Sequence, residues 1–212
     1  MTTIKRIIIA DDHAIFREGL KQVIAKTADT VVADEAANGQ ELLKKVRETD
    51  YDAVLLDISM PGRSGLDILG DLKALRPRLP VIILSMYPEE QYAVRAFRAG
   101  AAGYLTKGSP VHELFQALEK VALGRKYVSP ALAEALVASM EEGHGEEPHT
   151  ALSNREYQVL CMIASGKTVG RIAAELTLSV KTVSTYRTQI LKKMCMRNNA
   201  ELTRYAIQHQ LA

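Results

Sequence analysis

Five short apolar runs alternate with stretches of helical spacing in the first part of this chain, and no other feature restricts its fold as much. The runs are rich in Ile, Val, Leu and Ala, and they occupy residues 4–10, 30–36, 53–57, 81–85 and 102–106. Between them, the spacing of apolar residues is nearer 3.6, as at Leu66, Leu69 and Leu72. Strands that alternate with helices predict an α/β domain with a doubly wound, five-stranded parallel sheet.

Length and composition favour a globular protein with two domains. The chain has 212 residues, and a typical domain has about 150. Hydrophobic residues make up 47% and charged residues 25%, which is near the globular average. The apolar runs fall far short of the roughly 18 residues that cross a bilayer, and Asp11 and Asp12 interrupt the first run too early for a secretory signal. We therefore expect a cytoplasmic protein with no membrane segment.

Charge is distributed unevenly, although the formal net charge is only +2. Residues 151–212 hold nine Lys and Arg against three Asp and Glu, whereas residues 129–150 hold five Glu and neither Lys nor Arg. A small basic domain behind an acidic spacer would attract the phosphate backbone of a nucleic acid. An ordinary basic domain with a solvated surface would give the same count, so charge alone leaves both explanations open.

The chain is predicted to have three parts: a first domain over residues 1–124, a linker over 125–150 and a second domain over 151–212. Residues 141–150 lack apolar periodicity and are rich in Glu and Gly, which is typical of a linker. Within the linker, Ser129 is expected to be an N-cap and Pro130 the first helical residue. This pair predicts a helix over residues 130–141 that tethers the two domains.

Polar residues stand where four of the apolar runs end. Asp11 and Asp12 follow the first run, and Asp57 ends the third. Ser85 ends the fourth run, and Lys107 follows the fifth. The carboxyl ends of parallel strands meet at one edge of a sheet, where such folds bind their ligands. We therefore expect these five side chains to lie close together.

Three carboxylates, a hydroxyl and an ammonium at one place predict a magnesium-dependent site that accepts a phosphoryl group. Asp57 is the predicted nucleophile, since the Met-Pro-Gly turn beyond it is expected to leave its carboxylate exposed at the rim. Asp11 and Asp12 add negative charge that a hard cation such as Mg²⁺ would balance. Lys107 would give the phosphoryl oxygens a fixed positive charge, and Ser85 would donate a hydrogen bond to them.

Each of these residues alone has an ordinary structural explanation. An Asp at a strand end usually caps a helix, and Asp12 could cap one that begins near His13. A metal-dependent phosphohydrolase would use the same acidic edge, but Ser59 stands where it would need a second acid. A dinucleotide-binding oxidoreductase is disfavoured because no Gly-x-Gly-x-x-Gly follows the first run. The occurrence of all five residues in order favours the phosphoacceptor site.

Residues 1 to about 124 resemble the receiver domain of two-component response regulators, which has a flavodoxin-like fold. The resemblance is carried by Asp11, Asp12, Asp57 with its Met-Pro-Gly turn, Ser85, Tyr104 and Lys107. It implies that a sensor histidine kinase phosphorylates Asp57. It also implies that Mg²⁺ is held by Asp12 and Asp57, with help from Asp11 and the backbone carbonyl of Ser59.

The resemblance further implies a switch. Ser85 would shift toward the phosphoryl group and let Tyr104 turn inward, which changes the surface formed by the fourth helix and the fifth strand. Such a protein is not an enzyme, although it can lose the phosphoryl group by slow autodephosphorylation. Met86 is bulkier than the residue that often follows the hydroxyl in receivers, and this leaves the phosphoryl lifetime open.

The basic segment carries signals for a sequence of short helices. Ser153 and Glu156 form a capping-box pattern that opens a helix ending at Gly166. A second helix is expected over residues 168–176, and Ser179 is the expected N-cap of a third. On the third helix, the residues at core spacing are Val180, Val183, Ile190, Leu191 and Met194. The opposite stripe is polar and basic, and it holds Lys181, Ser184, Thr185, Thr188 and Lys192.

Two helices joined by a short turn, with a polar face on the second, match a helix-turn-helix, although amphipathic surface helices are common. The pattern from Leu152 to Lys193 closely resembles the LuxR-type DNA-binding domain, and the whole chain resembles response regulators of the NarL/FixJ class. This resemblance implies that the third helix enters the major groove. The base-facing candidates are Lys181, Ser184, Thr185 and Thr188. The phosphate-facing candidates are Thr182, Tyr186, Arg187 and Lys192.

The predicted function is that of a DNA-binding response regulator whose phosphorylation promotes dimerisation and binding to double-stranded promoter DNA, and so controls transcription. The expected partners are a sensor histidine kinase, the promoter, RNA polymerase and a second copy of the chain. The last helix, over residues 199–209, places Leu202, Tyr205 and Ala206 on one face. That face could form the dimer or pack on the domain core. An interaction module that binds protein or RNA is the remaining alternative.

Overall fold

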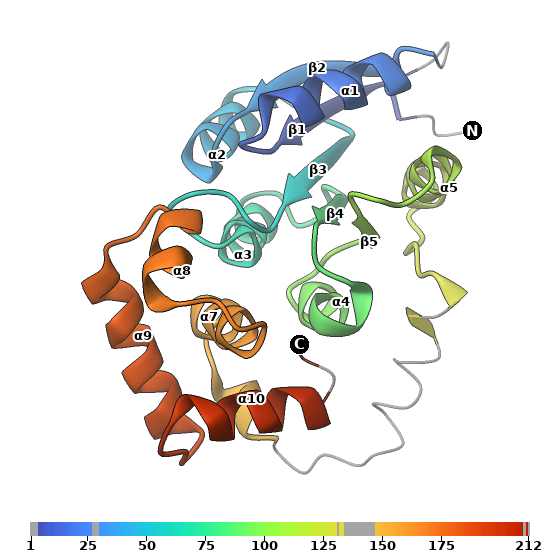
Figure 1. Ribbon diagram of the computed structural model, residues 1–212. Coiled ribbons are helices and arrows are strands. Elements are labelled where there is room, and N and C mark those ends of the chain that lie inside the picture. Colours follow the sequence, from blue (N-terminus) through green and yellow to red (C-terminus); the bar gives the residue numbers. More distant parts are fainter. Residues whose placement is uncertain (1–3, 27–29, 131, 134–146, 210, 212) are drawn as a thin grey trace. The chain divides into compact units, whose positions relative to one another are not determined.

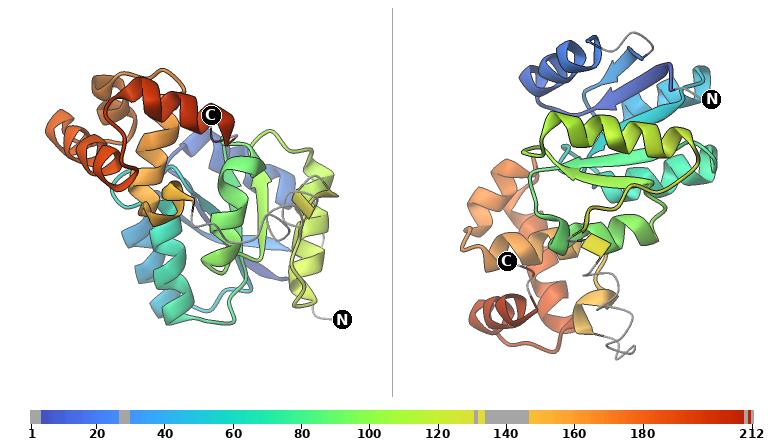
Figure 2. Two further views of the ribbon diagram at one scale, coloured as in Figure 1. Left: turned by 90° about the horizontal axis from the view of Figure 1, so that it is seen from below. Right: turned by 90° about the vertical axis from the view of Figure 1, so that its right-hand side faces the viewer.

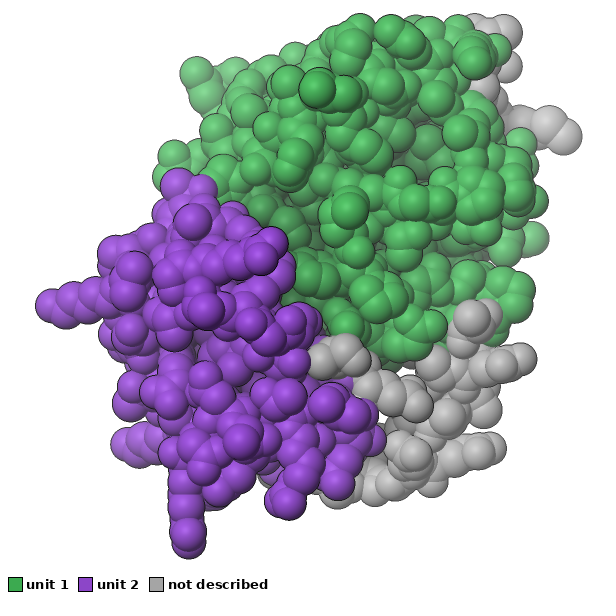
Figure 3. Space-filling model, in the orientation of Figure 1, with its two compact units in different colours: residues 1–133 green, residues 134–212 purple. Residues whose placement is uncertain are grey.

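In the computed structural model the chain forms two compact units, Met1–Ala133 and Glu134–Ala212 (Figures 1 and 3). Each unit is described by itself. The residues that the structure describes are 4–26, 30–130, 132–133, 147–209 and 211. Among these, no helix is both long and apolar enough to cross a membrane.

The first unit is a parallel five-stranded sheet with the strand order β2-β1-β3-β4-β5. Its strands are β1 (Arg6–Ala10), β2 (Val31–Ala36), β3 (Ala53–Asp57), β4 (Val81–Ser85) and β5 (Gly103–Thr106). Its helices are α1 (Ala14–Ile24), α2 (Gly39–Glu48), α3 (Gly65–Leu75), α4 (Glu89–Arg98) and α5 (Val111–Ala122). Helices α1 and α5 cover one face, and α2, α3 and α4 cover the other (Figures 1 and 2). The predicted fold class is confirmed.

The continuous apolar runs of β3 and β4 explain why these strands occupy the middle of the sheet. Every residue of both strands is buried, because helices cover the sheet on both faces. On the face of α1 and α5, the core includes Ile7, Ile9, Leu55, Leu84 and Leu105. Strand β2 lies at an edge and is only partly buried. The central strands therefore form a rigid base for the residues at their carboxyl ends, Asp57 and Ser85.

Three strands begin slightly later than their apolar runs: β1 by two residues, and β2 and β5 by one. Strand β1 begins at Arg6 rather than at residue 4, and the carboxylate of Asp52 accepts hydrogen bonds from the main-chain N–H groups of Lys5 and Arg6 at 2.8 and 2.9 Å. These bonds satisfy the main chain where the ladder has not yet formed. The apolar character of Ile4 reflects burial in the core rather than strand pairing.

The segment after α5 stays with the first unit. Tyr127 forms a parallel bridge with Gly103 of β5, and a helical turn begins at Pro130. The Ser129 hydroxyl accepts a hydrogen bond from the main-chain N–H of Leu132 at 3.1 Å, as expected for an N-cap. The remainder of the helix predicted over residues 130–141 lies outside the described residues.

The second unit is helical. It contains the 3₁₀ turn η1 (Pro148–Ala151) and the helices α7 (Asn154–Ala164), α8 (Val169–Glu175), α9 (Val180–Lys193) and α10 (Asn199–Gln208). The predicted capping box is present, since Ser153 and Glu156 each accept from the main chain of the other. Thr168 and Ser179 cap α8 and α9 as N-cap residues. Helix α7 packs against both α9 and α10.

Two residues of the predicted core of α9 are not fully buried: Val180 is exposed, and Leu191 is partly buried. Val180 is 56% exposed, whereas Val183 and Ile190 are completely buried. Val180 is the first residue of α9, and the buried part of the helix begins about one turn later, at Val183. The spacing of apolar residues does not reveal this difference. The apolar stripe of α9 is therefore shorter at its N-terminal end than the sequence indicates.

The close approach of α3 to β3 yields a stability prediction. A Cβ atom on Gly65 would lie 2.3 Å from the Asp57 carbonyl oxygen and 2.6 Å from Ile58 Cα, so a side chain must displace backbone. Gly65→Ala should reduce the free energy of unfolding of the first unit by about 2 kcal/mol or more in urea titrations. Gly70→Ala in the same helix meets nothing within 4 Å and should raise it by roughly 0.5–1 kcal/mol. Equal changes in the free energy of unfolding for the two substitutions would contradict a close approach of α3 to β3 at Gly65.

Candidate functional site

A buried cluster of charged side chains lies at the carboxyl edge of the sheet. Lys107 Nζ is 2.8 Å from Asp57 Oδ2 and 2.6 Å from Asp11 Oδ2. Asp11 follows β1, Asp57 ends β3 and Lys107 follows β5, so three strand ends contribute. The main-chain N–H of Lys107 donates to the Ser85 carbonyl at 2.7 Å, which ties the lysine to β4 as well. The structure thus brings together residues that are far apart in the sequence.

Burial controls the electrostatics of this cluster. The side chains of Asp57, Asp11 and Lys107 are 0%, 1% and 6% exposed. Burial raises the pKa of the Asp57 carboxyl, and the ammonium of Lys107 opposes that rise. Burial would lower the pKa of Lys107, but the two carboxylates outweigh it and raise that pKa. Lys107 is therefore held as an ammonium ion between two acids, and the ring of Phe16 covers its Nζ at 4.8 Å.

The acidic residues around Asp57 form a set of donors suited to a divalent cation. Asp11, Asp12, His13 and Asp57 each offer one atom, and these atoms lie within 4.8 Å of one another. Asp12 is 31% exposed at its side chain, so the pocket opens to solvent on that side. Three carboxylates against one ammonium leave negative charge, and carboxylate oxygens are ligands that Mg²⁺ favours. This pocket could therefore hold Mg²⁺.

Ser59 lies in the turn that follows β3. Its main-chain N–H donates to Asp57 Oδ1 at 3.0 Å, so both oxygens of Asp57 have partners within the protein. Gly62 has a φ of +87°, a conformation that residues with a side chain rarely adopt. The Met-Pro-Gly sequence thus allows the chain to turn sharply. The prediction that this turn leaves the Asp57 carboxylate exposed is wrong, because the side chain is 0% exposed beneath the pocket.

Ser85 and Tyr104 are both buried beside this edge. Asp57 pairs with Leu84 in the sheet, so Ser85 lies one residue further along the neighbouring strand. The Ser85 hydroxyl accepts from the main-chain N–H of Tyr87 at 3.0 Å. Tyr104 is completely buried, and its hydroxyl donates to the Tyr87 carbonyl at 2.9 Å. The inward position of Tyr104 that was predicted to follow phosphorylation is thus already present in this structure. Burial raises the pKa of Tyr104, so its phenol remains a neutral donor.

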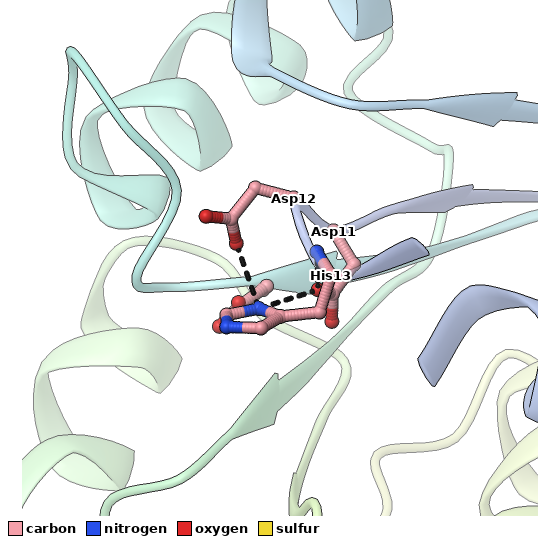
Figure 4. A group of neighbouring side chains, drawn as sticks. Asp11, Asp12 and His13 are labelled. Atoms are coloured by element: carbon pink, nitrogen blue, oxygen red, sulfur yellow. Dashed lines mark hydrogen bonds and ion pairs between the residues drawn. The ribbon is translucent and has the colours of Figure 1, made fainter. Parts of the chain in front are cut away.

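Three residues of the site were not predicted from the sequence. Helix α1 begins at Ala14 and has His13 at its N-cap position, so Asp12 is not the cap. The His13 ring contacts the acidic pair (Figure 4), and the Phe16 ring covers Lys107. Arg17 donates to the Asp11 carbonyl at 2.6 Å. The spacing i, i+3, i+4 puts positions 13, 16 and 17 on one face of the helix that follows the acidic pair, and that spacing could have identified them.

In the second unit, α9 presents the polar face that the sequence indicated. The exposed residues are Lys181, Ser184, Thr185, Thr188 and Lys192. The partly buried ones are Thr182, Tyr186 and Arg187. All four predicted base-facing residues are thus exposed, whereas three of the four predicted phosphate-facing residues are partly buried.

Side-chain contacts hold this helix in place. Arg187 Nε donates to Asn199 Oδ1 of α10 at 2.6 Å, so part of its guanidinium is already engaged. Lys193 pairs with Glu156 of α7 at 2.6 Å. The hydroxyls of Thr185 and Thr188 donate to main-chain carbonyls one turn earlier, at 3.0 Å each. These hydroxyls therefore present their lone pairs, rather than their protons, to a ligand.

The open question about α10 is answered in part by packing. Leu202 and Ala206 are completely buried, and α10 packs against α7. The Tyr205 hydroxyl lies 2.8 Å from Nδ1 of His149 in η1. This face of the helix is therefore used inside the second unit.

Known proteins match both units. Residues 7–119 match the response regulator receiver domain, and residues 150–206 match the bacterial regulatory proteins of the luxR family. The response regulator GacA of Pseudomonas protegens is 37% identical over 204 residues, which cover 96% of each chain. The response regulator UvrY of Escherichia coli is 34% identical over 206 residues, which cover 97% of this chain and 94% of UvrY.

A solved structure has the same arrangement of domains along its sequence. RcsB from Salmonella enterica serovar Typhimurium, bound to promoter P1flhDC in the presence of the phosphomimetic BeF₃⁻, matches with a TM-score of 0.61 and 25% identity. The match covers 96% of this chain and 98% of that one. These similarities extend over nearly the full length of the chain and include both domains. The chain belongs to the NarL/FixJ class of two-component response regulators, with a receiver domain followed by a LuxR-type DNA-binding domain.

Proposed function

We propose that Asp57 accepts a phosphoryl group from a sensor histidine kinase and that this event controls binding of α9 to promoter DNA. The observation that carries the proposal is the position of Lys107, whose ammonium lies between the carboxylates of Asp11 and Asp57. A fixed positive charge at that position favours a reaction in which negative charge accumulates beside Asp57.

In the transfer, a carboxylate oxygen of Asp57 forms a bond to phosphorus, and the bond from phosphorus to the donor breaks. Lys107 then pairs with a phosphoryl oxygen in place of Asp57 Oδ2. The Ser85 hydroxyl, now an acceptor for the Tyr87 N–H, donates its own proton to another phosphoryl oxygen. Asp11, Asp12, Asp57 and the Ser59 carbonyl would hold Mg²⁺, which supplies positive charge to the phosphoryl oxygens.

The phosphorylated state differs from the unphosphorylated one around Ser85 and the segment that follows it. Ser85 Oγ and the Tyr104 hydroxyl both bond to the main chain of Tyr87, so a shift of Ser85 acts on the start of α4. A change of a few kcal/mol in this segment is enough to shift the population between two receiver surfaces. The favoured surface promotes a homodimer. The chain does not turn over a substrate, and it loses the phosphoryl group slowly by autodephosphorylation.

The DNA-binding domain supplies the output. Helix α9 enters the major groove, where Lys181, Ser184, Thr185 and Thr188 face the bases. The candidates for phosphate contacts are Thr182, Tyr186, Arg187 and Lys192. Two copies of α9 occupy neighbouring half-sites in the dimer. The protein acts in the cytoplasm, where the promoter and RNA polymerase are found.

Phosphorylation can be tested with a small phosphodonor such as acetyl phosphate. The wild-type chain should gain one phosphoryl group in intact-mass spectra, and Asp57→Asn should gain none, because an amide cannot form the acyl phosphate. Removal of Mg²⁺ with EDTA should abolish labelling of the wild type. Asp50→Asn is the matched control, since the Asp50 side chain is 91% exposed, and it should label normally. Labelling of Asp57→Asn at the wild-type rate would reject Asp57 as the acceptor.

Base recognition by α9 can be tested with the phosphorylated protein, a bound promoter fragment and a scrambled duplex. Lys181→Ala and Thr185→Ala should each weaken promoter binding by about 1–3 kcal/mol, roughly 5- to 150-fold, and weaken binding to the scrambled duplex less. Lys192→Ala should weaken binding to the promoter and to the scrambled duplex equally. It should also reduce the slope of log affinity against log salt concentration by about one. Gln189→Ala, at an exposed position of the same helix, is the control. Equal losses on both duplexes for Lys181→Ala would exclude base readout by that residue.

A further inference from the structure

The segment that leaves the receiver is bonded to the start of α4. The Ser129 hydroxyl donates a hydrogen bond to Glu89 Oε2, and Glu89 is the first residue of α4. The same hydroxyl accepts from the main-chain N–H of Leu132 at 3.1 Å, and the Ser129 carbonyl accepts from that of Ala133 at 3.0 Å. Ser129 is thus both the cap of the last turn of the first unit and a partner of α4.

We propose that the hydrogen bond from Ser129 to Glu89 transmits the state of Asp57 to the segment that leads from the receiver to the DNA-binding domain. The inference rests on the proposed function, because phosphorylation of Asp57 is its input. Phosphorylation draws Glu89 away from Ser129, and the turn that Ser129 caps then loses part of its stability. Neither the phosphoacceptor cluster nor the base-reading face of α9 includes these two residues.

One hydroxyl serves both contacts. A serine hydroxyl has one proton and two lone pairs. In Ser129 the proton goes to the Glu89 carboxylate, so a lone pair stays directed at the N–H of Leu132. Connected hydrogen bonds polarise one another, so loss of the carboxylate weakens the cap as well. Burial raises the pKa of the Glu89 carboxyl, and the bond from Ser129 lowers it, so this bond favours the charged acceptor.

The part of the segment before Ser129 is held by β5 rather than by the start of α4. The main-chain N–H of Tyr127 donates to the Ala102 carbonyl at 2.8 Å, and Tyr127 pairs with Gly103 as a parallel bridge. The Tyr127 side chain is buried. A movement of the start of α4 relative to β5 therefore acts on the bond that Ser129 makes.

The order of the strands gives the direction of this movement. Strand β5 is at the edge of the sheet, with β4 on one side and the bridge to Tyr127 on the other. The segment around Tyr127 thus lies on the outer side of β5, away from β3. Because Asp57 ends β3, a shift of Ser85 toward a phosphoryl group on Asp57 is directed away from this segment.

The main chain carries the shift from Ser85 to Glu89. The Ser85 hydroxyl accepts from the N–H of Tyr87, and only Pro88 separates Tyr87 from Glu89. When Ser85 turns toward the phosphoryl group and retains this bond, it draws Tyr87 and the first residue of α4 in the same direction. The distance between Glu89 and Ser129 then increases.

Amide hydrogen exchange of the full chain, followed by NMR, tests the link. The two states are the protein alone and the protein saturated with Mg²⁺ and the phosphoryl mimic BeF₃⁻. In the wild type, the N–H groups of Leu132 and Ala133 should exchange about fivefold faster with BeF₃⁻, which is the factor that loss of a typical N-cap contribution gives. Exchange rates at these two groups that are equal in both states would overturn the proposal.

Two variants of neighbouring acids separate the link from ordinary capping. Glu89→Ala removes the acceptor, so Leu132 and Ala133 should exchange fast with and without BeF₃⁻. Glu90→Ala is the matched control, because Glu90 is also in the first turn of α4 but is exposed, and it should behave as the wild type does. If Glu89→Ala left the exchange rates at the wild-type values, Ser129 would be a cap that does not depend on α4, and the proposal would be rejected.

Promoter binding provides the functional measurement. The ratio of promoter affinities with and without phosphorylation should fall about fivefold in Glu89→Ala and in Ser129→Ala, and it should keep the wild-type value in Glu90→Ala. Wild-type ratios in both Glu89→Ala and Ser129→Ala would show that the bond does not transmit the signal.

Labelling by acetyl phosphate, measured on the same preparations, separates this inference from the proposed function. All three variants should be labelled as the wild type is, which also verifies that the receiver is folded. Normal labelling at Asp57 with unchanged exchange at Leu132 and Ala133 rejects only the link. Absence of labelling in the wild type rejects the proposed function and, with it, this inference.

Discussion

The ammonium of Lys107 is the interaction on which the receiver site depends, because it holds two buried carboxylates from different strands at one place. Asp11 and Asp57 are almost completely buried, and their like charges repel each other at a cost in free energy. Lys107 offsets that cost through contacts of 2.6 and 2.8 Å and joins the ends of β1, β3 and β5. The ammonium therefore opposes the rise that burial causes in the pKa of Asp57. The remaining acids make the pocket attractive to a divalent ion.

Much of this arrangement follows from periodicity. A parallel sheet brings the carboxyl ends of its strands together, so the residues after each apolar run must meet at one edge. Asp57 and Lys107 are fifty positions apart, yet they form a direct ion pair. The same reasoning could not locate His13, Phe16 or Arg17, because it identifies only residues that directly follow the ends of strands. Their placement depends on which face of α1 turns toward the pocket. The i, i+3, i+4 spacing of positions 13, 16 and 17 is consistent with one such face, but it identifies them only when it is combined with the position of the acidic pair.

In the helical domain, the sequence predicted the helices but not all of their tertiary contacts. Capping residues predicted two of its helices well, since Ser153 and Ser179 accept from the main chain as N-caps. Thr168, which was expected to be the first residue of the second helix, is instead its N-cap. Spacing alone still placed Val180 in the core, where it is exposed. It also could not show that Arg187 is tied to Asn199 of α10. Amphipathic periodicity identifies the polar face of a helix, but tertiary contacts determine which polar side chains on it remain accessible.

The link between the proposed phosphoacceptor Asp57 and the surface of the receiver is short. Tyr87 receives bonds from two directions, because its N–H donates to Ser85 Oγ and its carbonyl accepts from the Tyr104 hydroxyl. Its ring packs against Tyr92 of α4, with centroids 4.8 Å apart. A movement of Ser85 would therefore stretch its bond to the Tyr87 N–H or move the main chain of Tyr87 with it. Since buried hydrogen bonds are costly to leave unmade, the second response would be favoured, and the change would pass to α4.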